Sequence, residues 1–151
     1  MPKQDFSFLH RLRVRWSEVD MQAIVFNGNY LNYFDVAFTE YWRATGLPNV
    51  IAQAAEGKEL FARKSTVEYM APARFDDELD IAVRCASMGR SSLQFILEIY
   101  HGEMHLISGE LVYVYADTEK RKSVAISEEW RAIITGFETL KPADARTDTR
   151  T

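Results

Sequence analysis

The sequence has only one cysteine and no long apolar run, and each scarcity excludes a class of protein. Cys85 has no partner for an internal disulfide anywhere in the 151 residues, which is typical of proteins in a reducing compartment. No segment reaches the roughly 20 consecutive apolar residues of a membrane-spanning helix. The N-terminal residues also lack the apolar core of a signal peptide. We therefore expect a soluble, cytoplasmic protein with no membrane partner.

Net positive charge is also absent. Lysine and arginine total 18 against 22 aspartate and glutamate residues, so the formal net charge is −4. Proteins whose main partner is nucleic acid usually carry the opposite balance, and we expect no such partner here. An anionic small molecule is not excluded, because binding it requires only a local basic patch.

The sequence does contain enough apolar material for a core. Apolar residues make up 47% of the chain and aromatic residues 13%. A chain of this length is typical of a single domain. We expect that domain to occupy residues 1–151, with flexible ends at residues 1–7 and 142–151.

The densest aromatic segment follows residue 29, and its spacing predicts a mostly buried helix. Asn27 or Asn29 is a suitable N-cap, and Gly46 followed by Pro48 predicts the C-terminal end. Apolar side chains recur every three or four positions, which is the period of a helix face. They are Tyr30, Tyr33, Phe34, Ala37, Phe38, Tyr41, Trp42 and Ala44.

Alternating apolar and polar residues predict five strands. Their expected ranges are residues 8–17, 60–75, 79–88, 92–101 and 106–117. In the first strand, Leu12, Val14 and Trp16 share one face. The connectors after the second, third and fourth strands are short and polar, which predicts antiparallel hairpins. Ser127 is the expected cap of a last short helix.

These elements together predict an α+β fold, in which one antiparallel sheet curls around one long central helix. A helix with so broad an apolar surface needs a partner that covers it. The predicted strands supply a sheet for that purpose.

The segment at residues 18–35, EVDMQAIVFNGNYLNYFD, resembles the opening of the hot-dog-fold acyl-CoA thioesterases of the 4-hydroxybenzoyl-CoA thioesterase type. Residues 67–81, VEYMAPARFDDELDI, are similar to a strand and Pro-Ala turn of the same family. Residues 89–100 and 108–117 match its later strands more loosely. The resemblance covers residues 8–137. This chain departs from the family pattern at Glu18, where a second aspartate is usual, at Ala23, where glycine is usual, and at Asn27, where tyrosine or histidine is common.

The resemblance implies a hot-dog fold and hydrolysis of an acyl-CoA to a free acid and CoA, with no cofactor and no metal. It also implies a homodimer or homotetramer with sites between subunits. An exposed sheet edge would be available for such pairing.

Asp20 is the expected catalytic residue. Thioester hydrolysis needs a group that attacks the carbonyl or activates water, and a carboxylate can do either. It also needs positive potential at the oxyanion, which free N–H groups at a helix start, here Asn27 and Gly28, could provide. From spacing alone, Asp20 is more simply explained as a turn cap. The resemblance maps the family's catalytic carboxylate onto Asp20, whereas Glu18 is expected to be structural.

Several residues are candidates for substrate binding. Phe26, Tyr30 and Trp16 are expected either to line an acyl pocket or to belong to the core. Two basic clusters could contact the CoA phosphates, or could be ordinary solvated turns. The first cluster is Arg90 with Ser91 and Ser92, and the second is Lys120, Arg121 and Lys122.

Two other functions remain open at this point. A hot-dog hydratase or dehydratase usually needs a catalytic histidine, and neither His10, His101 nor His105 lies near Asp20 in sequence. A non-catalytic protein that binds acyl-CoA or an acyl carrier is compatible with the departures from the family pattern. His101 and His105 flank a turn without a third ligand, so we expect no zinc site.

Overall fold

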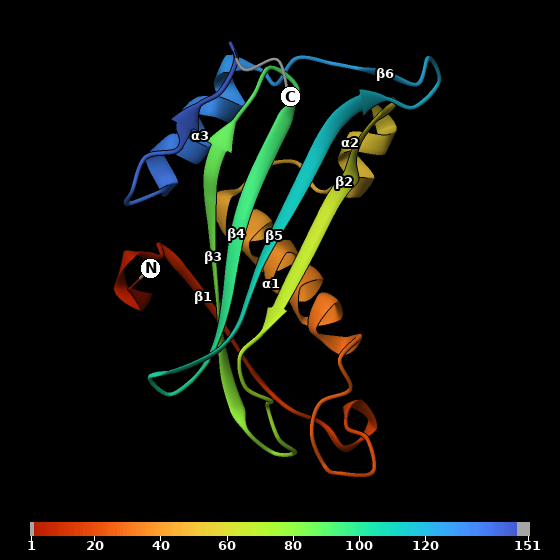
Figure 1. Ribbon diagram of the computed structural model, residues 1–151. Helices are drawn as coiled ribbons and strands as arrows, with labels where there is room; N and C mark the ends of the chain where they lie inside the picture. The colour runs from red at the N-terminus through yellow and green to blue at the C-terminus, as the bar shows by residue number, and fades with distance from the viewer. Residues whose placement is uncertain (1, 148–151) are drawn as a thin grey trace.

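A computed structural model describes residues 2–147 and shows a curved antiparallel sheet packed against one long helix (Figure 1). The five long strands lie in the order β1-β3-β4-β5-β2, and all neighbouring pairs are antiparallel. Two short strands extend the sheet, with β6 on β5 and β7 on β3. The predicted α+β architecture, a sheet wrapped around one central helix, is therefore confirmed.

The described chain runs through these elements in a simple order, with the long helix before four of the five long strands. They are η1 Lys3–Asp5, β1 Phe8–Arg13, η2 Trp16–Glu18, α1 Asn29–Thr45, α2 Val50–Ala55, β2 Lys58–Tyr69, β3 Glu78–Met88, β4 Ser92–His101, β5 Met104–Asp117, β6 Lys122–Ser123, α3 Glu128–Phe137 and β7 Ala143–Asp144. None of the helices in this part of the chain combines the length and the apolarity needed to cross a bilayer.

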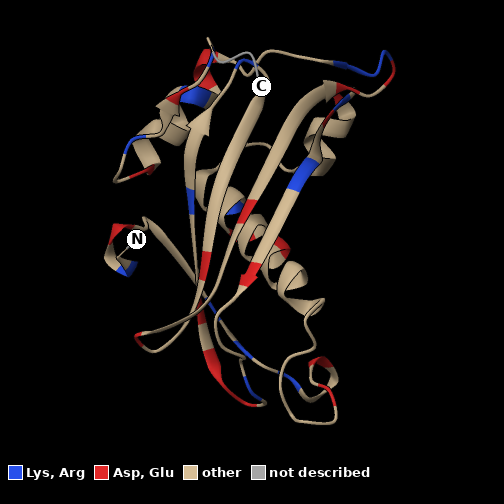
Figure 2. Cartoon of the chain, in the orientation of Figure 1, with Lys and Arg blue, Asp and Glu red and all other residues tan. Residues whose placement is uncertain are grey.

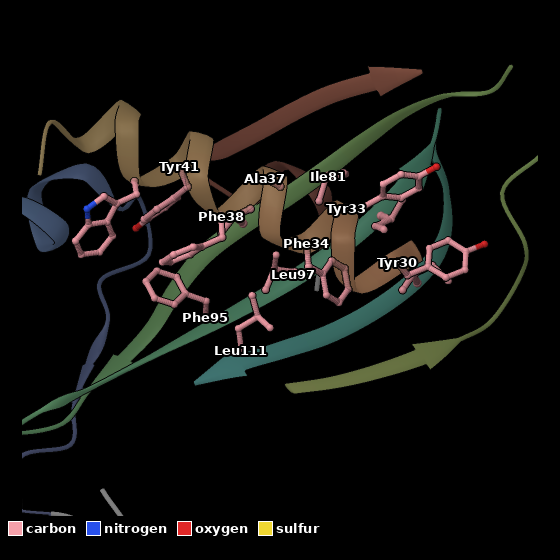
Figure 3. Packing of buried hydrophobic residues seen from close by; sticks show 14 of the residues in the cluster. Tyr30, Tyr33, Phe34, Ala37, Phe38, Tyr41, Ile81, Phe95, Leu97 and Leu111 are labelled. Carbon is pink, nitrogen blue, oxygen red and sulfur yellow. The ribbon is translucent and has the colours of Figure 1, made fainter. Parts of the chain in front are cut away.

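Helix α1 is the centre of the core, as its spacing predicted. The buried positions are Tyr30, Tyr33, Phe34, Ala37, Phe38, Tyr41 and Trp42, which form one stripe. Figure 3 shows this stripe lying against β4 and β5, where the Phe38 and Phe95 ring centroids are 4.9 Å apart. Gly46 ends the helix in the left-handed region, with φ 79°, as predicted. Ala44 is exposed, because it falls outside the stripe.

The start of α1 differs from the prediction. Gly28 occupies the N-cap position, and no side chain caps the helix. Asn29 is already helical, and its Nδ2 donates instead to the Glu18 carbonyl at 2.9 Å. The prediction of an asparagine cap at Asn27 or Asn29 was therefore wrong, because a tertiary contact uses the Asn29 side chain.

The first strand is shorter than predicted and ends at Arg13. The chain leaves the sheet there and tightens into η2, which ends the two-residue alternation. Val14 is buried, but Trp16 is 68% exposed, so the prediction of a shared face was wrong for Trp16. Its ring packs edge-on against Phe75 at 5.1 Å.

The predicted hairpin between the second and third strands is also wrong. Strand β2 ends at Tyr69 and pairs only with β5, whereas β3 pairs with β1 and β4 on the other side of the sheet. The connection at residues 70–77 therefore crosses the sheet instead of turning back. Pro72 in this segment has no N–H to donate to a ladder. The hairpins that join β3 to β4 and β4 to β5 are confirmed.

A buried carboxylate holds the C-terminal segment to the core. Glu138 is 1% exposed and accepts hydrogen bonds from Ser7 Oγ at 2.7 Å, Tyr41 Oη at 2.5 Å and the Cys85 N–H at 2.7 Å. Burial and this carboxylate raise the pKa of Tyr41. Three donors satisfy this carboxylate, so the residue after α3 is fixed at once to α1, to β3 and to the segment just before β1.

Short regular elements lie in both segments for which the sequence predicts flexibility. Residues 3–5 form η1, and Lys3 Nζ lies 2.8 Å from the Asp80 carboxylate. Ala143 and Asp144 form β7 along the end of β3. Flexibility of these ends stays a prediction, and residues 1 and 148–151 lie outside the described part of the chain. Ser127 caps α3 as predicted, because its Oγ accepts from the Trp130 N–H at 3.1 Å.

Candidate active site

Asp20 lies in a small closed turn between η2 and α1. Val19 bridges Val25 in antiparallel fashion, and the Asp20 N–H donates to the Ile24 carbonyl at 2.9 Å. The Ala23 N–H donates back to the Asp20 carbonyl at 3.0 Å, which closes a four-residue turn. The turn is thus held at its base and presents its first side chain to solvent.

The Asp20 carboxylate has one engaged oxygen. Its Oδ1 accepts from the Gln22 N–H at 2.8 Å, which is the side-chain contact of an Asx turn. No residue between 2 and 147 donates a hydrogen bond to Oδ2. Both explanations given for Asp20 therefore fit the geometry, since one oxygen closes the turn and the other faces solvent.

The turn needs a left-handed residue, and Ala23 occupies that position with φ 60°. Glycine reaches this region without steric cost, whereas a Cβ costs roughly 1–2 kcal/mol. The departure from the family pattern at residue 23 therefore places strain directly beside the candidate catalytic residue. Sequence spacing alone gave no signal of this strain.

Glu18 is tied into the protein and is not free for chemistry. Its carboxylate accepts from the Arg15 N–H at 2.8 Å, from the Arg15 guanidinium at 2.7 Å and from Tyr33 Oη at 3.0 Å. Burial raises the pKa of Glu18, but the hydrogen bonds from Arg15 and Tyr33 outweigh burial and leave the pKa below its usual value. Burial and the same contact raise the pKa of Tyr33. These contacts agree with a structural role for Glu18.

The start of α1 is held beside the Asp20 turn. The Glu18 carbonyl accepts from the Phe26 N–H at 3.0 Å as well as from Asn29 Nδ2. Within residues 2–147, the N–H groups of Asn27 and Gly28 donate to no backbone or side-chain acceptor. The Gly28 N–H belongs to the N-cap of α1 and the Asn27 N–H directly precedes it, so an oxyanion placed there would lie near the positive end of the α1 dipole.

Two aromatic residues predicted near the site have different environments. Phe26 is 56% exposed, and a Cβ on Gly28 would lie 3.2 Å from its Cε2. Tyr30 is buried, and its Oη accepts from the Ala73 N–H at 3.0 Å. Burial raises the pKa of Tyr30. The exposed Phe26 ring is therefore available to a ligand, whereas Tyr30 packs in the core.

The structure brings the two predicted basic clusters together. Arg90 Nη1 lies 3.4 Å from Ser123 Oγ in β6, next to Lys120, Arg121 and Lys122 in sequence. The charge drawing shows the basic turn before β6 at the far end of the sheet from the loop that precedes α1 (Figure 2). Asp20 and the basic clusters of one chain therefore lie at opposite ends of the molecule.

Ser91 and Ser92 are not at the surface of that cluster. They are 6% and 4% exposed, because their turn is packed beneath β5 and α3. The Tyr115 N–H donates to the Ser91 carbonyl at 2.8 Å. The buried Arg131 guanidinium donates to the Gly89 and Arg90 carbonyls. Arg90 is thus the exposed member of this group.

Sequence reasoning missed one large cavity. It measures 610 Å³ and lies between α1, α2 and the sheet, away from the Asp20 turn of the same chain. Apolar walls from Phe38, Trp42 and Leu60 line it, and Gln53 of α2 borders it. An isolated glutamine in α2 gave no signal of a site in the sequence.

Metal ligands are not gathered anywhere in residues 2–147, since no group of three or more histidine, cysteine or acidic side chains could hold a metal ion. His105 stacks on Tyr100 at 4.9 Å and shares its Nε2 with Ser108 Oγ at 2.9 Å. Cys85 is buried, and burial raises the pKa of its thiol.

Comparison with known proteins supports a single family. The sequence profile of the thioesterase superfamily matches residues 22–108, a span that starts just after Asp20. The chain is 34% identical over 116 residues to the acyl-CoA thioester hydrolase YbgC of Escherichia coli O157:H7. That alignment covers 76% of this chain and 86% of the relative.

Solved structures share the fold at lower identity. A 1,4-dihydroxy-2-naphthoyl-CoA thioesterase from Synechocystis has a TM-score of 0.79 at 17% identity, covering 84% of this chain and 94% of that one. A thioesterase from Thermus thermophilus, crystallised with coenzyme A and zinc, has a TM-score of 0.76 at 24% identity, covering 89% and 96%. These likenesses establish the fold.

Proposed function

The chain belongs to the thioesterase superfamily, and from that premise we propose that it hydrolyses acyl-CoA thioesters to a free acid and CoA. The observation that carries the proposal is the pairing of a carboxylate with one unengaged oxygen, on Asp20, and a helix start with two unengaged N–H groups, on Asn27 and Gly28. The Glu18 carbonyl holds these two parts on one short loop.

In the proposed reaction, Asp20 either attacks the thioester carbonyl or removes a proton from an attacking water molecule. Negative charge then develops on the carbonyl oxygen, where the N–H groups at the start of α1 stabilise it. When water is the nucleophile, collapse of the intermediate breaks the C–S bond and releases the CoA thiolate and the acid. When Asp20 is the nucleophile, the same collapse leaves a mixed anhydride on Asp20, which a water molecule then hydrolyses to the acid and free Asp20. Either role requires Asp20 in its ionised form.

We further propose that the working form is a homodimer, or a tetramer of such dimers, joined along β2. This twelve-residue strand is an edge of the sheet, and pairing with its own copy would satisfy its outward backbone groups. The neighbouring surface carries exposed apolar side chains on both ends of α1. Phe26, Leu31 and Tyr69 lie at its N-terminal end, and Val50 and Ile51 follow its C-terminal end.

Antiparallel pairing of two β2 strands would bring these two apolar groups together. The N-terminal end of α1 in one subunit would then face α2 of the other subunit. The same rotation brings Asp20 of one chain toward the cavity and the basic clusters of its partner. This accounts for the separation of Asp20 from Arg90 and Arg121 within one chain, and places the CoA phosphates on the partner's basic end.

The decisive experiment is hydrolysis of a panel of acyl-CoA thioesters, followed with a thiol reagent that reports free CoA. Thiol release with catalytic turnover would support the proposal. Binding without turnover would instead indicate a non-catalytic acyl-CoA binding protein, and hydration of an unsaturated acyl-CoA without thiol release would indicate a hydratase. We also propose a cytoplasmic location, in keeping with an acyl-CoA substrate and a single free thiol.

A further inference from the structure

The cavity between α1, α2 and the sheet has the size of a ligand site. At 610 Å³ it falls within the usual range of roughly 300–1,000 Å³ for small-molecule pockets. A second cavity, which Gln53 also lines, measures 280 Å³ and is below that range. The walls of the larger cavity are mainly apolar and aromatic, from Phe38, Trp42, Leu47, Leu60 and Tyr113.

Gln53, one of the residues that line this cavity, has a buried polar atom without a partner in residues 2–147. Gln53 is 3% exposed, and its Nε2 donates to the Pro48 carbonyl at 2.8 Å. Its Oε1 accepts no hydrogen bond from any residue in the described part of the chain. Leaving a buried acceptor unpaired costs about 1–3 kcal/mol. Such an atom is therefore a candidate contact for a ligand donor.

The amide orientation is well defined by its surroundings. The Pro48 carbonyl can only accept, so the Gln53 atom that faces it must be the amide nitrogen. The same carbonyl also accepts from Trp42 Nε1 at 2.7 Å. Loss of the Gln53 donor would therefore leave the Pro48 carbonyl with one hydrogen bond. Gln53 Oε1 is the side-chain atom that has no partner in the described part of the chain.

Several other polar groups around the cavity are already engaged or hydrated. Thr39 Oγ1 donates to the Asp35 carbonyl at 2.9 Å, and Arg43 pairs with Glu40. Asn49 Oδ1 accepts from the Ala52 N–H at 2.9 Å. The Asp35 carboxylate belongs to an exposed residue, where water competes with any ligand donor.

We propose that this cavity receives the acyl group of the substrate and that Gln53 Oε1 selects acyl groups with a hydrogen-bond donor, such as a hydroxyl, at their far end. The inference rests on the proposed function and on the dimer joined along β2, which brings Asp20 of the partner subunit toward this cavity. The aromatic walls contact the apolar body of the acyl group. Gln53 accepts from its terminal donor, so the residue determines specificity without taking part in the chemistry.

The expected discrimination follows from the unpaired acceptor. An acyl group without the donor fills the cavity but leaves Gln53 Oε1 buried and unpaired. Sites built to hydrogen-bond a ligand hydroxyl reject the analogue that lacks it much more strongly than apolar pockets reject a change of size. For one neutral hydrogen bond we expect a preference of at least about tenfold.

The test measures binding with non-hydrolysable thioether analogues of CoA. One analogue carries a 3-phenylpropyl group and the other a 3-(4-hydroxyphenyl)propyl group. Calorimetry should give a Kd at least about tenfold lower for the hydroxylated analogue with the wild-type protein. Gln53→Met keeps the length of the side chain and removes the acceptor, so the two Kd values should become equal within about twofold.

Leu60→Met is the matched control, because it reshapes the same cavity at nearly constant volume and retains Gln53. It should change both affinities together and preserve the preference. Equal affinities in the wild-type protein would show that Oε1 binds only water, and would overturn the inference. A shift of Gln53→Met to monomers in sedimentation would assign Oε1 to the subunit interface and overturn it as well.

Hydrolysis of the two corresponding thioesters separates this inference from the proposed function. Turnover of both, with equal Kd values for the analogues, rejects the role of Gln53 and leaves the thioesterase activity standing. A hydroxyl preference in binding without any turnover rejects the activity and supports the cavity assignment.

Discussion

Tyr33 Oη donates a hydrogen bond to Glu18 Oε1 at 3.0 Å and thereby joins the first turns of α1 to the segment that precedes the Asp20 turn. Arg15 contacts the same carboxylate from its backbone N–H and its guanidinium. The Asp20 turn is therefore anchored on one side by an acid that is itself fully engaged. The first two predictions distinguish the roles of these neighbouring acids.

Glu18→Gln should lower stability in a pH-dependent manner. The folded-state pKa of Glu18 lies below its ordinary value of 4.5. The folded protein therefore stabilises the ionised form of Glu18 relative to the protonated form. The stabilisation is fully present above the unfolded pKa and is lost as pH falls through the folded pKa. At pH 7 we expect a loss of about 0.5–1.5 kcal/mol in the free energy of unfolding. Thermal unfolding from pH 7 to pH 3 should show the difference from wild type shrinking below pH 4.5; a difference independent of pH would contradict this account.

Asp20→Asn should abolish most activity and retain the fold. The asparagine Oδ1 can still accept from the Gln22 N–H, so the turn should close as before. Loss of the charge should lower kcat by at least about a hundredfold, the low end for removal of a general base. Asp20→Glu should also be poor, because the longer side chain displaces the carboxylate from a fixed carbonyl.

Glu18→Gln is the control for Asp20→Asn when both are assayed well below their melting temperatures, and it should cost much less activity. Near-normal turnover in Asp20→Asn together with an inactive Glu18→Gln would mean that the catalytic acid is Glu18. Full activity in both variants would show that the active site does not lie in this loop.

Ala23→Gly should stabilise the protein. Ala23 has φ 60°. Glycine has no Cβ, so it adopts this backbone conformation without the steric cost that alanine has. The net gain should be about 1 kcal/mol after the larger chain entropy of glycine in the unfolded state is subtracted. For a domain of this size, that corresponds to a rise in melting temperature of roughly 2–4 °C.

Ala54→Gly is the matched control for Ala23→Gly, since it places the same change inside helix α2. It should lower the melting temperature, because glycine costs about 1 kcal/mol in a helix interior. If both substitutions destabilise the protein equally, the turn at residue 23 is not strained.

Neutralisation of the basic end should weaken the affinity for CoA thioesters. Arg90→Ala, or replacement of Lys120, Arg121 and Lys122 by alanine, should raise KM because the CoA phosphates lose cationic partners. Thioesters of pantetheine lack the nucleotide phosphates, so their KM should barely change in the same variants. Equal effects on both substrates would show that these side chains do not contact the nucleotide.

The proposed dimer should depend on the exposed apolar residues of α2. Val50 and Ile51 are 69% and 77% exposed, so aspartate at both positions should leave the isolated fold intact but disrupt a packed interface. Sedimentation should show dimers or tetramers for wild type at micromolar concentration and monomers for the double variant. Met104→Asp changes an equally exposed apolar residue on the β4–β5 hairpin and should leave the assembly unchanged. A wild-type monomer with full thioesterase activity would reject the shared site.

Much of the fold follows from local patterns in the sequence. The spacing of the apolar residues from Tyr30 to Trp42 is that of one face of a helix. Gly46 marks a helix end through its left-handed backbone, and Ser127 marks a helix start through its side-chain cap. The position of β2 could not be predicted in this way. The alternation of apolar and polar residues at 60–69 is compatible with pairing to either β3 or β5. Only tertiary packing determines that the strand pairs with β5.

The candidate site was predictable only in part. The Asp20 turn and the start of α1 adjoin in sequence, so local reasoning reached both. Burial of Ser91 and Ser92 depends on the packing of α3, and the exposure of Trp16 depends on where η2 begins. Gln53 differs from an ordinary helical glutamine only because a cavity and a proline carbonyl surround it, and no sequence pattern records either.

Gly109 determines how close α1 can approach the sheet. A Cβ at this position would overlap the Phe34 ring and lie 2.6 Å from the Thr66 carbonyl oxygen, which is backbone and cannot swing aside. Even alanine would therefore push the helix outward or open β5 from β2. In a saturation library selected for folding, position 109 should tolerate no replacement, whereas the neighbouring Ser108 and Glu110, which alternate to the other face of the strand, should tolerate more replacements. Sequences that diverge from this chain could thus replace most core residues through compensating pairs of substitutions, but they should retain glycine at position 109.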